Sequence, residues 1–148
     1  MAFEAKLYIG EQVFTHEEFE LKKNVYDLVE CEYEFFQTLD ESGKPASRPQ
    51  GGIIKFVMPA QGDDDMLFYE WMFNRAAKHR GTIEFCLSTD KNKEKYLHLF
   101  FDEAYLVNFY QYFHNANSML MRSKVTLSAK KIVFGSGATF VNDWRLPM

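Results

Sequence analysis

The stretch VECEYEF, residues 29–35, alternates strictly between apolar and acidic side chains. The odd-numbered positions hold Val, Cys, Tyr and Phe, whereas glutamate occupies positions 30, 32 and 34. Successive side chains of a β-strand point to opposite faces, so this pattern is typical of a strand with one buried and one solvated face. The stretch predicts an antiparallel strand.

The same period of two recurs along most of the chain. It is found in FEAKLYI (3–9), GIIKFVM (52–58), TIEFCL (82–87), KYLHLFF (95–101), AYLVNFYQYF (104–113) and SKVTLSAKKIVF (123–134). The turn-forming link STDKNKE (88–94) predicts a hairpin between two of these strands. We therefore expect a mainly β fold: a two-sheet antiparallel β-barrel or sandwich of about seven or eight strands, in a single domain spanning residues 1–148.

One stretch, DDDMLFYEWMFNRAAKHRG (63–81), has helical spacing instead. Leu67 with Trp71, and Phe68 with Met72, stand four residues apart. Aspartates at 63–65 suit the start of a helix, basic residues at 78–80 suit its end, and Gly81 suits a stop. This pattern predicts one amphipathic helix from about Asp64 to Ala77. The region 11–24 fits either a helical turn or a hairpin return.

Composition limits the classes of function. A chain of 148 residues that is 47% hydrophobic can bury a sizeable core. Its net charge of −4, with scattered Lys and Arg, argues against nucleic acid as a partner. The start MAFEAKLYIGEQ lacks the apolar run of a signal peptide, and no stretch is long and apolar enough for membrane insertion, so we expect a cytoplasmic protein. Cys31 and Cys86 are expected to be core thiols, with a disulfide as the alternative.

Motifs that carry chemistry are lacking. The sequence holds no G-x-S-x-G, P-loop or C-x-x-C pattern. His16 opens HEEFE, but Glu20 stands where a zinc helix needs its second histidine. The three aspartates at 63–65 lack the spaced ligand series of a calcium loop. We therefore expect neither an enzyme nor a bound metal or cofactor.

The longest polar segment, SGKPASRPQGG (42–52), lies between two predicted strands. Pro45 and Pro49 restrict its conformations, so it would lose less entropy on docking than a Gly/Ser loop. Gly51 and Gly52 would let the backbone turn back into the next strand. This segment is a candidate surface for association.

Four segments in consistent order resemble a known family: SRPQGG (47–52), FYEWM (68–72), DEAYLVNFYQYF (102–113) and VTLSAKKIVFG (125–135). They are similar to the tube protein of type VI secretion (Hcp, TssD), and closest to a divergent branch with a Ser-Arg-Pro-x-Gly-Gly segment. The extra residues Glu11 to Glu20 and the C-terminal stretch ATFVNDWRLPM depart from the family pattern.

The resemblance implies a β-barrel with one helix that forms hexameric rings. The rings would stack into a hollow tube that carries small effectors and is expelled by a contractile sheath. The implied partners are further copies of the chain and the sheath, spike and effector proteins. The implied location is the cytoplasm of a Gram-negative bacterium, followed by export without a signal peptide.

The resemblance further implies that the loop from Leu39 to Gln50 reaches a neighbouring subunit or ring. Its expected contact residues are Lys44, Pro45, Ser47, Arg48, Pro49, Gly51 and Gly52. From charge alone, Arg48 could pair with the glutamates at 30, 32 and 34 of a neighbour. The alternative function is that of a monomeric β-barrel that binds a small apolar ligand among its aromatic side chains.

Overall fold

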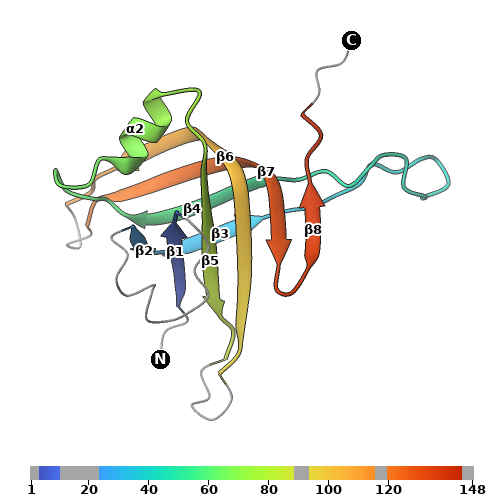
Figure 1. Cartoon of the computed structure of the whole chain (residues 1–148), viewed down its shortest axis with the longest axis horizontal. Helices are drawn as coiled ribbons and strands as arrows, with labels where there is room; N and C mark the ends of the chain where they lie inside the picture. The colour runs from blue at the N-terminus through green and yellow to red at the C-terminus, as the bar shows by residue number, and fades with distance from the viewer. Residues whose placement is uncertain (1–3, 11–23, 89–93, 116–119, 145–148) are drawn as a thin grey trace.

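The structure, a computed structural model, describes residues 4–10, 24–88, 94–115 and 120–144. Within these ranges the chain forms eight strands and one helix (Figure 1). In chain order they are β1 (Ala5–Ile9), β2 (Val25–Asp27), β3 (Glu30–Tyr33), β4 (Ile53–Pro59), α2 (Leu67–Phe73), β5 (His79–Cys86), β6 (Tyr96–Tyr112), β7 (Arg122–Phe134) and β8 (Ala138–Val141). The mainly β class is confirmed.

All strand pairs are antiparallel and belong to one curled sheet rather than two separate ones. The order is β2-β1-β5-β6-β7-β4-β3. Strand β8 pairs with residues 131–134 of β7, beyond the part of β7 that pairs with β4. The predicted hairpin of β5 and β6 is confirmed by their pairing. The two stretches 95–101 and 104–113 are joined as the single strand β6, which bends at Glu103 (φ 48°).

Two consecutive backbone groups close the sheet into a barrel. The N–H of Leu28 donates to the carbonyl of Ala5 (2.9 Å), and the N–H of Val29 donates to the carbonyl of Val57 (2.7 Å). Before this point the chain pairs with β1, and after it the chain pairs with β4. The segment 25–33 therefore joins the two ends of the sheet.

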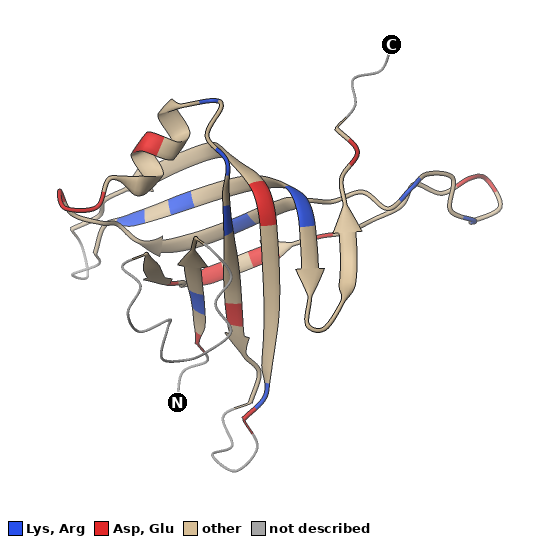
Figure 2. Cartoon of the chain, in the orientation of Figure 1, with Lys and Arg blue, Asp and Glu red and all other residues tan. Residues whose placement is uncertain are grey.

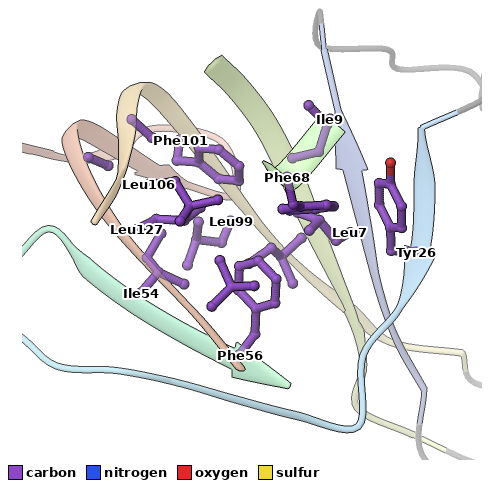
Figure 3. Packing of buried hydrophobic residues seen from close by; sticks show 14 of the residues in the cluster. Leu7, Ile9, Tyr26, Ile54, Phe56, Phe68, Leu99, Phe101, Leu106 and Leu127 are labelled. Carbon is purple, nitrogen blue, oxygen red and sulfur yellow. The ribbon is translucent and has the colours of Figure 1, made fainter. Parts of the chain in front are cut away.

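The barrel interior is filled with apolar side chains from all parts of the sheet (Figure 3). The largest fully buried ones include Leu7, Ile54, Phe56, Phe68, Trp71, Leu99, Phe101 and Leu127. Helix α2 contributes Phe68 and Trp71, and the Nε1–H of Trp71 donates to the carbonyl of Ala104 in β6 (3.2 Å). The helix is thus tied to the sheet from inside the core.

Helix α2 is shorter at both ends than the expected span of Asp64 to Ala77. Asp65 lies before the helix, where its carboxylate accepts hydrogen bonds from the hydroxyl of Tyr26 (2.8 Å) and the N–H of Leu67 (3.2 Å). At the other end Asn74 is extended (φ −117°, ψ 102°), and its side-chain oxygen accepts from the N–H of Ala76 (3.0 Å). Such local side-chain bonds compete with the helical ladder and end it.

The residues expected to end the helix belong to the next strand. His79 and Arg80 begin β5, and Gly81 follows them within the strand. A Cβ at Gly81 would lie 2.5 Å from the carbonyl oxygen of Tyr8 and 2.6 Å from Cζ of Phe101. Glycine is needed there because backbone and ring approach closely, and not as a helix stop.

Both cysteines are free and partly buried, so no disulfide joins them. Cys31 packs against the core, and burial raises the pKa of its thiol to about 12. The Cys86 Sγ–H donates to the carbonyl of Ser88 (3.2 Å). No helix among the described residues has the length and apolar character needed to cross a membrane. His16, the segment from Glu11 to Glu20, and residues 145–148 lie outside the described ranges.

Candidate functional site: an exposed arm and the groove at its base

The most prominent feature of the surface is an extended arm, residues 34–50, between β3 and β4. Its two runs leave the barrel together and meet at a tip well away from the sheet (Figure 1). Isolated bridges between Phe36 and Gln50 and between Leu39 and Pro45 hold the runs side by side. Every residue of the arm except Ser47 is exposed. The arm includes the loop predicted from sequence and begins five residues earlier than the expected Leu39.

The arm has an internal hydrogen-bond ladder. Phe36 and Gln50 exchange backbone hydrogen bonds of 2.9 and 2.7 Å. The N–H of Ala46 donates to the carbonyl of Thr38 (2.7 Å), and the N–H of Thr38 donates to Oγ of Ser47 (2.9 Å). These bonds define one conformation in a segment that buries little apolar surface.

The tip is organised around the carboxylate of Asp40. Its Oδ1 accepts from the backbone N–H of Ser42 (2.9 Å), the hydroxyl of Ser42 (2.7 Å) and the N–H of Lys44 (3.0 Å). The hydrogen bonds from the Ser42 side chain, followed by the Lys44 backbone, lower the pKa of Asp40. A short polar side chain that bonds its own turn in this way is a common means of fixing a turn.

Two glycines form the base of the arm on its return run. Gly52 has φ +95°, and a Cβ there would lie 2.7 Å from the carbonyl oxygen of Ala129. At Gly51 a Cβ would lie 2.5 Å from the ring of Phe35. Gly52 therefore turns the backbone, as expected, whereas Gly51 makes room for an aromatic ring.

The expected contact residues all lie on the arm or its base. Lys44 and Pro45 are at the tip, Ser47, Arg48 and Pro49 are on the return run, and Gly51 and Gly52 join the arm to β4. The side chain of Arg48 is 78% exposed, and its guanidinium pairs with Asp143 of the same chain (3.2 Å). A pairing of Arg48 with the glutamates of a neighbour stays a prediction.

Apolar side chains are exposed along the arm and beside it. On the arm, Phe36 is 48% and Leu39 is 63% exposed. At its base, Phe35 lies 5.1 Å from Phe140 and 5.8 Å from Phe134, between ring centroids. These rings line one side of an open groove of about 1230 Å³ between the arm and β8. Exposed apolar surface of this kind marks an interaction site.

The strands next to the arm carry both acidic and basic residues (Figure 2). The glutamates at 30, 32 and 34 are exposed, as their alternation predicted. In the register of the sheet, Glu32 lies opposite Lys55 of β4. Two residues further along β4, Val57 lies opposite Lys124 of β7. One face of the sheet therefore carries acidic and basic side chains next to each other.

Sequence reasoning missed three parts of this surface. The start of the outgoing run, Glu34 and Phe35, was assigned to a strand because it ends the alternating stretch VECEYEF, and Phe36 was assigned to neither the strand nor the loop. Asp40 could have been found, since Asp followed by Ser and Gly in DESGK is a turn signature. The partners of the arm at positions 142 and 143 lie far away in sequence, and no local pattern indicates them.

The chain is similar to proteins of one family. Residues 1–145 match the profile of the family described as hemolysin coregulated protein Hcp (TssD). Hcp1 from Flavobacterium johnsoniae is 26% identical and superposes with a TM-score of 0.75, covering 95% of this chain and 100% of that one. No curated protein matches the chain.

Two solved structures with lower identity have the same fold. A type VI secretion system effector from Yersinia pestis is 11% identical with a TM-score of 0.63, covering 93% of this chain and 99% of that one. The secreted protein Hcp3 from Pseudomonas aeruginosa is 14% identical with a TM-score of 0.56, covering 95% and 99%.

Proposed function

The chain belongs to the hemolysin coregulated protein (Hcp, TssD) family, and from this membership we infer that it is a structural subunit of the type VI secretion tube. Proteins of this family build the tube and are not enzymes. We propose that this chain forms hexameric rings, and that the rings stack into the hollow tube.

The observation that carries the proposal is the ordered arm. Residues 34–50 have their own hydrogen bonds, yet they expose Phe36 and Leu39 and bury little against the barrel. An arm of this kind is suited to a neighbouring copy, because a ring requires two different surfaces of each subunit to meet head to tail. A preformed arm also loses less conformational entropy on docking.

We assign the contact role to the arm residues expected from sequence: Lys44, Pro45, Ser47, Arg48, Pro49, Gly51 and Gly52. We also place the chain in the branch with the Ser-Arg-Pro-x-Gly-Gly segment, because its residues 47–52 are SRPQGG. The proposed partners are further copies of the chain, the sheath, the spike and small effectors. The proposed route leads from the cytoplasm of a Gram-negative bacterium to the outside without a signal peptide.

The alternative, a monomeric barrel for a small apolar ligand, would need room inside the barrel. In the described residues the interior is occupied by side chains such as Leu7, Phe56 and Phe101. The large groove lies outside, at the base of the arm. This arrangement favours association over ligand storage.

The substitution Leu39→Asp tests the proposal. It places a charge on an exposed apolar position of the arm, so we expect it to reduce ring formation while the thermal unfolding temperature of the protomer stays nearly unchanged. Light scattering measures the particle mass, and negative-stain images show rings or tubes. Leu120→Asp, at a position that is 75% exposed outside the arm, controls for the loss of any exposed leucine. A wild-type chain that stays monomeric at high concentration would contradict the proposal.

A further inference from the structure

The residues that follow β8 contact three separate parts of the molecule. Nδ2 of Asn142 donates to the carbonyl of Gly51 at the base of the arm (3.1 Å). The carboxylate of Asp143 pairs with Arg48 on the return run (3.2 Å). The ring of Trp144 lies 5.4 Å from that of Tyr105 in β6.

Both ends of this segment are attached to the barrel. Residues 138–141 pair with β7, and the N–H of Asn142 donates to the carbonyl of Lys130 (2.6 Å). Beyond the arm, Trp144 reaches β6. Between these attachments the chain crosses the base of the arm, where Phe140 also meets Phe35. In Figure 1 the arm runs across the direction of β8 as it leaves the barrel.

We propose that residues 140–144, here called the strap, are positioning residues that set the direction in which the arm projects. The proposal rests on the proposed function in one respect, namely that a correctly directed arm docks on a neighbouring copy. The position of the arm within a single protomer does not depend on that function.

The arm needs such a support because its own bonds do not attach it to the barrel. The ladder between Phe36 and Gln50 holds the two runs to each other. On the return run the joint is Gly51 and Gly52, which have no side chains to pack. At the joint itself, the carbonyl of Gly52 accepts from the N–H of Ala129 (2.8 Å). Beyond that bond, the aromatic contact of Phe35 and the strap contacts at Gly51 and Arg48 fix the angle of the arm.

No single strap contact is strong. The pair of Arg48 and Asp143 is exposed, and exposed ion pairs contribute little because water and salt screen them. The strap is effective because a hydrogen bond, an ion pair and ring packing come from one short segment whose two ends are already held. Reversing one charge turns an attraction into a repulsion at the joint. The direction of the arm should therefore change more than the stability of the protomer.

A distance measurement tests the proposal within one protomer. Spin labels are placed at Glu41→Cys on the tip and Glu70→Cys on α2, both at exposed positions, with Cys31 and Cys86 replaced by alanine. The labelled chain is diluted in excess unlabelled chain, so that only distances within a protomer are measured. We expect a narrow distribution for the parent chain, and a shifted or broadened one for Asp143→Arg.

A charge swap separates positioning from general damage. The double variant Arg48→Asp with Asp143→Arg restores the ion pair in reverse, and we expect it to restore the narrow distribution. A second variant with alanine at 142, 143 and 144 should broaden the distribution further while the urea unfolding transition stays cooperative. In ring assembly, Asp143→Arg should raise the concentration for half-assembly by about two- to fivefold, the range of an exposed ion pair. The swap is judged by the distances alone, because Arg48 is itself a proposed contact residue.

Two results would overturn the proposal: a parent distribution that is already broad, or one that changes in neither Asp143→Arg nor the triple alanine variant. Broadening that the swap fails to reverse would exclude the ion pair as a positioning contact. If the parent chain forms no rings, the proposed function fails, yet the distances still decide the role of the strap.

Discussion

At the scale of single residues, Trp71 joins α2 to the strands β5 and β6. Its side chain is 1% exposed, and its Nε1–H donates to Ala104 in β6. Its ring lies 5.9 Å from Phe68 and 4.6 Å from His79. A short helix depends on such packing, because a helix of two turns is not stable by itself in water.

We expect Trp71→Ala to lower the free energy of unfolding by about 3–5 kcal/mol, the usual cost of removing a large aromatic side chain from a core. Urea unfolding followed by circular dichroism measures the change. Phe73→Ala in the same helix is the matched control, because Phe73 is 81% exposed. The control should change the free energy by no more than about 0.5 kcal/mol. A loss below about 1 kcal/mol for Trp71→Ala would contradict the buried role.

At the scale of elements, the sequence pattern predicted which elements form better than where they end. The four-residue spacing of Leu67 and Trp71 identified α2, because burial of one helix face imposes that period. The ends of the helix depended on Asp65 and Asn74, whose side chains accept hydrogen bonds from nearby backbone N–H groups in place of the helical ladder. Periodicity carries no information about that competition.

The arm illustrates the same limit for the candidate site. Its polar, proline-containing return run was recognisable as a surface loop, and all seven expected contact residues lie on it or at its base. Its contacts with Asn142 and Asp143 were not recognisable, since they join positions about ninety residues apart. Contacts of that kind arise from the closure of the whole sheet.

The Asp40 carboxylate should govern the order of the arm tip. We expect Asp40→Ala to accelerate hydrogen exchange at the amides of Ser42 and Lys44, which lose their acceptor. Exchange in β6 and β7 and the urea midpoint should stay unchanged, because the tip does not pack on the barrel. Glu41→Ala, one residue further along, is the control and should leave exchange at both amides as it is. Equal exchange in the two variants would show that Asp40 does not hold the turn.

At the scale of the whole molecule, the barrel closes through one short stretch of backbone. Leu28 bonds to β1 and Val29 bonds to β4, so adjacent residues serve opposite ends of the sheet. The alternation in VECEYEF predicted a strand here but not its second partner, because one face pattern is compatible with many pairings. Closure is a property of the assembled sheet.

We expect Val29→Pro to lower the free energy of unfolding by about 1–3 kcal/mol, because it removes the N–H that bonds to Val57 and leaves that carbonyl unpaired. Val29→Ala keeps the N–H and is the control. The side chain of Val29 is 46% exposed, so alanine should cost no more than about 0.5 kcal/mol. Thermal and urea unfolding measure both variants, and equal stability of the two would exclude a role of this bond in closure.

The same closure affects the order in which the parts of the chain fold. Ala5 pairs with the distant Phe85, and the closing bonds of Leu28 and Val29 can form only when both ends of the sheet are in place. Chains dominated by such distant contacts fold on the order of milliseconds to seconds. The arm is a local hairpin, and hairpins form within roughly 1–10 μs. The hairpin of the arm can therefore form and reopen many times before the barrel is complete, since an isolated hairpin is only marginally stable. The arm acquires its final direction only after β8 has paired with β7 and residues 142 and 143 reach Gly51 and Arg48.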